Sequence, residues 1–338
     1  MTTAQAVWFS RPRTVEIRPA EVGGPRPGQV LVEAELSAIS AGTELLVYRG
    51  LVPPGLEPDL PTVDGSFAFP LKFGYACVGR VLAVGPGVVG RSVGQRVFAL
   101  HPHQSLFTAP ADLTVPLPDG MPTEVGVFFA NLETAFNVLL DAHPRLGETV
   151  AIFGQGVVGL LITGLARLAG AGRIIAIDPL PPRRAAAVRL GADLALSPEE
   201  AEPPRLRGLG AGRGLDLAIE ASGTASALQT ALDAVAFQGT VVACAWYGSK
   251  PLALELGDRF HRQRLRLISS QVSNLDPGLS PRWDRPRRTR AVLDLLPRLD
   301  LADLITHRLP LARAADAYRL LDERPAEALQ VTLTYDER

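Results

Sequence analysis

The feature that most constrains this chain is a glycine-rich turn between an apolar strand and an apolar helix. The segment 150–178 reads VAIFGQGVVGLLITGLARLAGAGRIIAID, in which Gly154, Gly156 and Gly159 form the pattern G-x-G-x-x-G. An apolar run precedes the turn, and a second apolar run ends at Asp178, 19 residues after Gly159. This order of strand, turn, helix, strand and acid predicts a βαβ unit that binds a dinucleotide.

Each part of this segment has a physical role. Gly154 permits the tight turn, Gly156 lets the backbone approach a pyrophosphate, and Gly159 lets the helix pack closely on the strand. The helix N-terminus offers free N–H groups to the phosphates, and Asp178 can accept hydrogen bonds from both ribose hydroxyls. A glycine-rich helix entry in an ordinary α/β sheet is the alternative. The predicted cofactor-binding residues are Gly154, Gln155, Gly156, Val157, Val158, Gly159, Asp178, Arg183, Ala221, Ser222 and Cys244.

Asp178 also bears on the choice between NAD and NADP. A carboxylate at this position repels a 2′-phosphate, so we expect NAD as the cofactor, with NADP as the alternative. Arg183 and Arg184 follow closely and could instead attract that phosphate. We expect Arg183 to pack near the adenine.

The composition excludes several functions. The chain has 338 residues, of which 47% are hydrophobic and 20% are charged, and its net charge is −1. This balance gives no electrostatic basis for binding nucleic acid or an anionic membrane. The N-terminus lacks the pattern of a signal peptide, and the longest apolar segment is interrupted by the glycine turn. We therefore expect a cytoplasmic protein that acts on a small molecule, with no nucleic-acid or membrane partner.

The chain has only two cysteines, Cys77 and Cys244, and both lie in apolar runs. This number excludes a disulfide scaffold and a zinc lobe of four cysteines. We expect both thiols to be buried and unreactive.

The pattern of the chain changes near its middle. Residues up to about 140 form short apolar segments broken by Pro and Gly, which predicts a compact β domain. Beyond them, strand and helix patterns alternate, which predicts a parallel sheet covered by helices. The predicted fold class is α/β, with a β-rich domain at 1–140 and 276–338 and a doubly wound dinucleotide-binding domain at 141–275. The β-rich domain must then supply most of the substrate site.

Two further segments have simpler interpretations. The Pro- and Gly-rich stretch 198–214 is predicted to be a surface loop. The arginine-rich stretch 282–290 is predicted to be a solvated face rather than a binding patch.

The order of these parts resembles the medium-chain dehydrogenase/reductase superfamily, the zinc-type alcohol dehydrogenases. Besides the glycine turn, the landmarks in order are AISAGTELLVYRG (38–50), FPLKFGYACVGRVLAVG (69–85), VGQRV (93–97), LDLAIEASG (215–223) and THRLPLARAADAYRLL (306–321). The resemblance implies a GroES-like β-barrel catalytic domain, a Rossmann domain, an active site in the cleft between them, and a homodimer.

The resemblance also implies where a catalytic zinc would be held. In the family, the ligands are the cysteine of C-G-T-D, the histidine of G-H-E and a third residue just before the nucleotide domain. The matching residues here are Ala41, Tyr75, and Ala130 or Asn131. Zinc requires sulfur, imidazole or carboxylate ligands, so we expect that no metal takes part. A different metal site formed by His101, His103 and Glu133 is the alternative.

Within the superfamily, the pattern S-x-I-S-x-G-T-E, with G-Y in place of G-H, is similar to the bacteriochlorophyllide dehydrogenase group. That group acts on a secondary alcohol, a hydroxyethyl side chain on a large macrocycle. The glutamate that follows the tyrosine in that group is Ala76 here, so the resemblance bears on the reaction type and not on the substrate. The matching residues are Ser37, Ile39, Ser40, Gly42, Thr43, Glu44, Tyr48, Gly50, Gly74 and Tyr75.

Without zinc, hydrogen-bond donors must stabilise the charge that develops on the reacting oxygen. The family's positions make Tyr75 the expected general acid, Thr43 the start of a proton relay, and His101 a pocket residue suited to proton exchange near neutrality. Each has a structural alternative: Tyr75 fills the space left by zinc, Thr43 caps a turn, and His101 is a hydrogen-bonded core residue. Leu46 occupies the place of the family's relay histidine.

Three further residues are expected to shape the pocket. Glu44 and Glu133 are expected to orient the catalytic groups. Trp246, which follows a predicted strand at 240–245, is expected to line the pocket of a planar or bulky substrate, with a place in the core as the alternative.

We therefore predict a zinc-independent, NAD(H)-dependent dehydrogenase or ketone reductase that interconverts a secondary alcohol and a ketone on a bulky substrate. An enoyl or quinone reductase is the first alternative, because zinc-free members of the superfamily often reduce C=C bonds. A protein that binds NAD(H) without turnover is the second alternative.

Overall fold

The computed structural model describes residues 1–58, 60 and 66–335 of the chain. The chain divides into two compact units, unit 1 (Met1–Ala130 with Leu293–Arg338) and unit 2 (Asn131–Val292). Both divisions fall inside helices, α3 (Phe129–Ala142) and α9 (Arg285–Leu295). The domain boundaries predicted from the sequence lie elsewhere along the chain and stay a prediction.

Unit 1 consists mainly of antiparallel strands. Its longest strand, β3 (Gln29–Ile39), alternates buried and partly exposed residues over most of its length, which is the pattern of a strand with one face on a core. Strand β3 pairs with three others, so it organises a sheet of order β14-β15-β3-β4-β5-β7 with β6 also on β3, while β1 and β2 form a separate pair. The other strands are β1 (Thr2–Arg11), β2 (Thr14–Val22), β4 (Cys77–Val84), β5 (Arg96–Ala99), β6 (Leu106–Pro110), β7 (Thr114–Pro116), β14 (Ile305–Pro310) and β15 (Gln330–Thr334).

Three short helices belong wholly to unit 1. They are α1 (Thr43–Tyr48), α2 (Thr123–Gly126) and α10 (Ala314–Glu323). Tyr48 of α1 stacks on Tyr318 of α10, and Phe9 of β1 meets the ring of Tyr318 edge-on with centroids 5.0 Å apart. This aromatic contact fixes α1, which carries Thr43 and Glu44, against the C-terminal helix.

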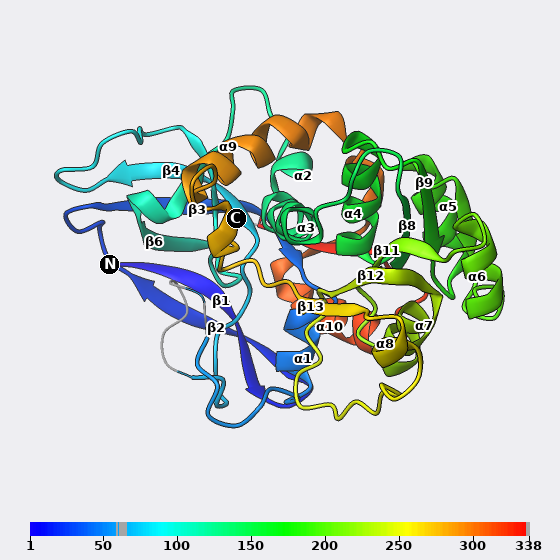
Figure 1. Ribbon diagram of the computed structural model, residues 1–338. Helices are drawn as coiled ribbons and strands as arrows, with labels where there is room; N and C mark the ends of the chain where they lie inside the picture. The colour runs from blue at the N-terminus through cyan, green and yellow to red at the C-terminus, as the bar shows by residue number, and fades with distance from the viewer. Residues whose placement is uncertain (59, 61–65, 336–338) are drawn as a thin grey trace. The chain divides into compact units, whose positions relative to one another are not determined.

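Unit 2 contains a six-stranded parallel sheet of order β10-β9-β8-β11-β12-β13 (Figure 1). Strands run outward from β8 in both directions, so β8 and β11 flank the point where the strand order reverses. The strands are β8 (Thr149–Phe153), β9 (Arg173–Ile177), β10 (Leu194–Leu196), β11 (Leu215–Glu220), β12 (Val235–Ala243) and β13 (Arg266–Ser269), and the helices are α4 (Val157–Leu168), α5 (Pro181–Arg189), α6 (Pro203–Leu209), α7 (Ala225–Ala234) and α8 (Arg259–Arg262). Strand β12 begins earlier than the strand predicted at 240–245.

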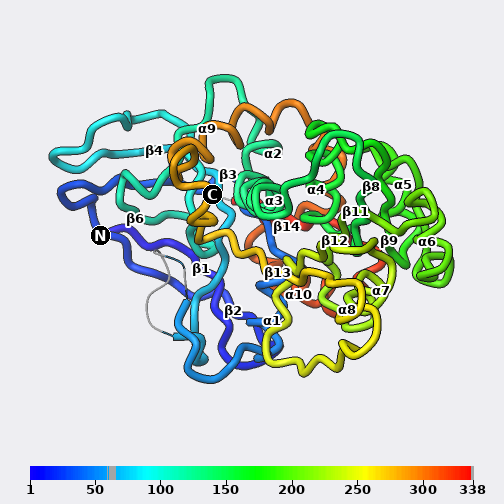
Figure 2. Tube along the Cα trace, viewed as in Figure 1, coloured from blue at the N-terminus to red at the C-terminus, as the bar shows by residue number. Residues whose placement is uncertain are grey.

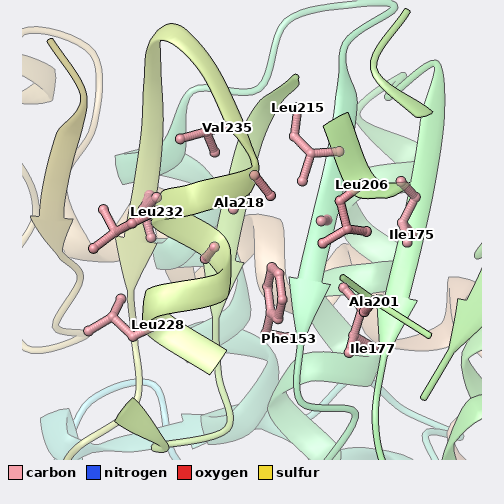
Figure 3. Packing of buried hydrophobic residues seen from close by; sticks show 14 of the residues in the cluster. Phe153, Ile175, Ile177, Ala201, Leu206, Leu215, Ala218, Leu228, Leu232 and Val235 are labelled. Carbon is pink, nitrogen blue, oxygen red and sulfur yellow. The ribbon is translucent and has the colours of Figure 1, made fainter. Parts of the chain in front are cut away.

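The core of unit 2 lies against this sheet. Figure 3 shows Phe153 of β8 and Ile175 of β9 on one face of the sheet, in contact with a cluster that includes Leu228 and Leu232 of α7. Strands β8 and β9 are buried on both faces, which is why their sequences read as continuous apolar runs rather than as alternation. The trace in Figure 2 follows the same alternation of strand and helix along the chain.

Two sequence-based predictions need correction. The stretch 198–214 is not simply a surface loop, because it contains α6, whose Leu206 is fully buried in the core of unit 2. Proline at the first helical positions lacks the N–H that would be unpaired there in any case, so Pro203 and Pro204 begin the helix rather than break it. In the stretch 282–290 most side chains are exposed as expected, but Arg288 is buried.

Among the described residues, no helix combines the length and the apolar character needed to cross a bilayer.

The burial of Leu206 predicts the cost of removing its side chain. Leu206→Ala should destabilise the protein by about 2–4 kcal/mol, because it removes apolar contacts and leaves a cavity. Urea unfolding should detect this loss, whereas Arg205→Ala on the exposed side of the same helix should change stability by no more than about 0.5 kcal/mol. Equal stability of the two variants would contradict the packing of α6.

Candidate active site

The glycine turn between β8 and α4 has no room for side chains at two of its three glycines. Gly154 has φ +90, and a Cβ there would lie 2.7 Å from the backbone N of Ser222. A Cβ at Gly159 would lie 1.9 Å from the carbonyl oxygen of Gly154. A Cβ at Gly156 would meet no atom within 4 Å, so this side of the turn is open. The turn therefore has the space that close approach of a pyrophosphate requires.

Gly156 is also the N-cap of the 12-residue helix α4, and no side chain caps this helix end. Val157 and Val158, the first two helical residues, are half-buried. Their N–H groups have no partner within the helix, so they can bind phosphate oxygens.

Asp178 follows β9 and is buried, with both carboxylate oxygens accepting backbone hydrogen bonds. Oδ2 accepts from the N–H of Gln155 at 2.8 Å, and Oδ1 accepts from the N–H of Leu180 at 2.8 Å. The first bond ties the acid directly to the glycine turn. Each oxygen keeps a second lone pair, so the carboxylate can also accept from ribose hydroxyls.

The side chains of Gln155, a predicted cofactor residue, and of Arg184 bind other parts of the protein. The side chain of Gln155 is buried, donates to the carbonyl of Ile152 at 3.0 Å and accepts from Thr163 at 3.0 Å. Its backbone N–H, not its amide, is the part that organises the site. Arg184 donates to the carbonyls of Asp178 and Pro179, so it supports the loop after β9. Arg183 is half-buried in the first turn of α5.

Sequence reasoning missed Glu220, the last residue of β11. Its side chain is fully buried and accepts hydrogen bonds from the N–H groups of Ser222 and Gly223, from the Ser222 hydroxyl and from the Tyr247 hydroxyl. An acid at the end of an apolar strand, two residues before a serine and glycine, is the sequence signal that could have revealed it.

The other predicted residues of unit 2 lie around this carboxylate. Ala221 donates its N–H to the carbonyl of Phe153 at 2.8 Å, and Cys244 directs its thiol to the carbonyl of Glu220 at 3.2 Å. Burial raises the pKa of the Cys244 thiol well above its usual range, so it stays protonated, as does the buried Cys77. Trp246 is half-buried.

Glu133 pairs with an arginine that the sequence did not single out. Arg288 donates from Nε to Glu133 at 3.2 Å and from Nη1 to Asn137 and to the carbonyl of Val272, both at 2.7 Å. Burial raises the pKa of the Glu133 carboxyl, and the Arg288 charge opposes that shift. Glu133 is therefore the partner of a buried guanidinium within unit 2.

Unit 1 contains a buried polar chain that begins at Glu44. The carboxylate of Glu44 accepts from the N–H of Ser40 at 3.0 Å, from His103 Nε2 at 2.9 Å and from the Tyr318 hydroxyl at 2.5 Å. His103 Nδ1 lies 2.7 Å from the Ser37 hydroxyl, which lies 2.7 Å from that of Tyr335.

Glu44, His103 and Ser37 are each fully buried. Because the carboxylate can only accept, His103 donates to it from Nε2, and Nδ1 contacts the Ser37 hydroxyl. A carboxylate buried in this way is stable only when several donors bind it. These hydrogen bonds therefore hold the turn at 40–44 in one conformation.

Thr43 belongs to this turn, and the Tyr75 hydroxyl lies beside the hydroxyls of Ser40 and Thr43. Burial and the negative charge of Glu44 raise the pKa of the Tyr75 phenol to about 12, while the neighbouring hydroxyls of Ser40 and Thr43 act in the opposite direction. Tyr75 is therefore a protonated phenol at neutral pH, a hydrogen-bond donor rather than a base. Thr43 is the first residue of α1 and is half-buried.

His101 differs from the expectation of proton exchange near neutrality. Its ring stacks on Phe107 with centroids 3.8 Å apart, and Nδ1 lies 2.8 Å from the carbonyl of Pro102. Burial lowers the pKa of His101 to about 3, although the bond to Pro102 opposes the shift. Because a carbonyl only accepts, Nδ1 carries the proton and the ring is neutral at physiological pH. This geometry favours the alternative of a hydrogen-bonded core histidine.

The residues at the family's zinc positions do not fit a zinc ion. Ala41 has no donor atom, and a Tyr75 phenol with a pKa of about 12 keeps the proton that a ligand must lose. Both ring nitrogens of His103 already have hydrogen-bond partners, and Glu133 is paired with Arg288. In the part of the chain that the structure describes, no group of three or more His, Cys, Asp or Glu side chains could hold a metal.

Part of the loop that follows α1 borders a cavity. Val47, Gly50 and residues 52–57 and 66–69 line a volume of about 450 Å³ with mainly apolar side chains. Phe67 contacts Phe73, and Phe73 contacts Tyr75, with ring centroids 5.6 Å and 6.3 Å apart. A series of aromatic rings therefore connects this cavity with Tyr75.

Comparisons with known proteins find relatives in sequence and in fold. Residues 157–288 match the family model described as zinc-binding dehydrogenase. D-guloside 3-dehydrogenase of Escherichia coli K12 is 29% identical over 78% of this chain and 77% of its own length.

Solved structures share the fold over nearly the whole chain. The 2R,3R-butanediol dehydrogenase of Bacillus subtilis has a TM-score of 0.83 at 20% identity and covers 98% of this chain and 100% of its own. An Escherichia coli CFT073 alcohol dehydrogenase complexed with NADH and a Sinorhizobium meliloti dehydrogenase bound to NADP each have a TM-score of 0.81 at 20% identity, with 99% and 100% coverage. The predicted combination of a GroES-like domain with a Rossmann domain is confirmed. In sequence over part of the chain, and in fold over nearly all of it, the protein is therefore similar to zinc-type alcohol dehydrogenases.

The open face of the glycine turn predicts how a single methyl group would act. Gly156 has φ −68, which alanine also adopts, so Gly156→Ala should keep the stability of the protein within about 0.5 kcal/mol. The methyl group should nevertheless weaken NADH binding by about tenfold or more, because it occupies the phosphate side of the turn. Fluorescence titration with NADH measures this, with Gly208→Ala on α6, where a Cβ is equally free, as control. Wild-type affinity in Gly156→Ala would contradict the phosphate assignment.

The lowered pKa of His101 predicts a loss of stability in acid. In the unfolded chain the pKa of His101 is about 6.5, so the unfolded state binds a proton as the pH falls below this value. In the folded state the pKa is about 3, so the folded state binds that proton only near pH 3. Between about pH 7 and pH 5 this lowers the free energy of unfolding by on the order of 2 kcal/mol. The His101→Gln variant has no such group and should not show this decrease. Urea unfolding at the two pH values tests this, and His261→Gln, at an exposed histidine, should behave as wild type. An equal acid response of wild type and His101→Gln would contradict the prediction.

Proposed function

We propose that this chain is a zinc-independent, NAD(H)-dependent oxidoreductase that interconverts a secondary alcohol and a ketone on a bulky substrate. The enzyme class, a dehydrogenase or reductase acting on CH–OH or C=O groups, agrees with the curated relatives, which are named dehydrogenases of alcohols. The observation that carries the finer proposal is the Tyr75 phenol, which lies beside the Thr43 and Ser40 hydroxyls at the family's position for a zinc-ligating histidine.

The residues of unit 2 fit a nicotinamide dinucleotide. The Gly156 side of the turn and the start of α4 suit the pyrophosphate, and Asp178 suits the adenosine ribose. The Asp178 carboxylate favours NAD, because it repels a 2′-phosphate. When bound, the cofactor supplies or accepts the hydride, and the chain must manage the proton and the charge on the substrate oxygen.

The proton is assigned to Tyr75. In the reducing direction its hydroxyl donates a hydrogen bond to the carbonyl oxygen and transfers its proton as the alkoxide forms, because an alkoxide is more basic than a phenolate. The adjacent Thr43 hydroxyl then stabilises the phenolate and returns the proton from solvent. Glu44 holds the turn that carries Thr43 and keeps Tyr75 protonated through its negative charge.

The bulky substrate is proposed from the apolar cavity beside α1 and its aromatic connection to Tyr75. The likeness to the bacteriochlorophyllide dehydrogenase group, a cytoplasmic location and a homodimer stay predictions of the sequence analysis.

The proposal predicts turnover without metal and a specific loss at Tyr75. Protein dialysed against EDTA and free of zinc by metal analysis should oxidise NADH in the presence of bulky ketones. Tyr75→Phe should lower kcat by about 10²-fold while leaving the Kd of NADH unchanged, because only the proton donor is removed. Tyr48→Phe is the matched control, since it removes another buried hydroxyl of unit 1, one that donates to the carbonyl of Arg13.

Four outcomes would contradict parts of the proposal. Stoichiometric zinc with loss of activity in EDTA would overturn zinc independence. Turnover of enones in place of ketones would identify a C=C reductase. NADH binding without turnover of ketones, alcohols or enones would identify a binding protein. Near-normal kcat in Tyr75→Phe would make the phenol a space-filling residue.

A further inference from the structure

Glu220 is a fully buried carboxylate that the reaction described above does not use. Its Oε1 accepts from the N–H of Ser222 at 2.7 Å, from the Ser222 hydroxyl at 2.5 Å and from the N–H of Gly223 at 2.9 Å. Its Oε2 accepts from the hydroxyl of Tyr247. A buried charge is costly unless donors surround it, so these four bonds fix the surrounding backbone in one arrangement.

These bonds join the loops that follow two neighbouring strands of the parallel sheet, β11 and β12, and the loop after β8 lies against the first of them. Ser222 belongs to the loop after β11, and its backbone N lies 2.7 Å from the position that a Cβ of Gly154, in the loop after β8, would take. Tyr247 belongs to the loop after β12, whose residue Cys244 also donates its N–H to the carbonyl of Glu220 at 2.9 Å. Figure 1 shows β8, β11 and β12 as adjacent strands. Glu220 therefore anchors the loops after β11 and β12, and the first of these loops packs against the glycine turn after β8.

The strand order determines which half of a dinucleotide these loops meet. A dinucleotide crosses the carboxyl ends of the strands at the point where their order reverses, between β8 and β11. Asp178 follows β9, on one side of β8, and suits the adenosine ribose. The loops after β11 and β12 lie on the other side of β8, where the nicotinamide half must extend.

We propose that Glu220 is a positioning residue for the nicotinamide half of the cofactor. It acts through the Ser222–Gly223 backbone and through Tyr247. The inference rests on the proposed NAD(H) binding and gives the two acids different roles. Asp178 determines the affinity for the adenosine half, and Glu220 holds the loops that receive the other half in one conformation.

The test compares two ligands, NADH and 5′-AMP, by fluorescence titration and calorimetry. Glu220→Ala should weaken NADH binding by about tenfold or more while the Kd of 5′-AMP stays within about twofold of wild type. Glu220→Gln should fall between, because its amide oxygen still accepts from Ser222 and Gly223. The loss of a negative charge near an anionic ligand would by itself strengthen NADH binding. Weaker NADH binding by the Glu220 variants would therefore report a change in loop conformation rather than in charge.

Three further variants make the comparison specific. Asp216→Ala removes a carboxylate that accepts from the N–H of Thr149 at 2.8 Å at the opposite end of β11, and it should bind both ligands as wild type does. Asp178→Ala should weaken both ligands, since the adenosine half is common to them. Tyr247→Phe removes one hydroxyl from Glu220 and should weaken NADH by about threefold with 5′-AMP unchanged, so it decides the question if Glu220→Ala does not fold.

The outcomes separate this inference from the proposed function. A wild-type protein that does not bind NADH would contradict the proposed function itself. A wild type that binds NADH, with Tyr247→Phe and any folded Glu220 variant binding it equally well, would overturn the role of Glu220 alone. A parallel loss of NADH and 5′-AMP affinity would also overturn it, because a general structural defect does not distinguish the two halves.

Discussion

The close approach of backbone to backbone at the start of α4 is the constraint on which unit 2 depends. Gly159 meets the carbonyl of Gly154, and Gly154 meets the loop at Ser222, at distances that exclude any Cβ. Helix α4 can therefore begin directly beside β8 and leave its first N–H groups open. Asp178 and Glu220 complete the arrangement, because each buried carboxylate accepts N–H groups from a loop that borders the turn. Steric space and buried charge together define the candidate dinucleotide site.

Unit 1 also contains a buried carboxylate, and a different set of hydrogen-bond donors stabilises it. Glu44 is fully buried, and a buried carboxylate is stable only when donors surround it. His103, Tyr318 and the backbone N–H of Ser40 supply those hydrogen bonds. The same negative charge helps to keep Tyr75 protonated. A buried acid thus links the rigidity of the turn to the protonation state of the proposed proton donor.

Much of the fold could be predicted from local patterns, and several parts of the site could not. The glycine turn, the strands of unit 2 and the acid at Asp178 follow from short-range spacing, which the chain carries in its own order. Helix α6 was missed because two prolines look like breakers, although they are tolerated in the first turn. Glu220 was missed, and His103 was considered only as a possible metal ligand, because their partners are backbone groups or residues far away in the sequence, such as Glu44. The behaviour expected of His101 assumed solvent, and burial beside Phe107 changed it.

The sequence by itself indicated a Rossmann unit in the second half of the chain and an acid after the second strand of that unit. It also placed Ala41 and Tyr75 at the positions that match zinc ligands in the superfamily that the chain resembles. These conclusions depend only on residue type and spacing. The tertiary structure decided which buried groups are charged, which hydroxyls and N–H groups stabilise them, and which histidine stays neutral. Those properties depend on desolvation and on contacts between residues such as Glu44 and Tyr318, which are 274 positions apart, and only the folded chain brings such residues together.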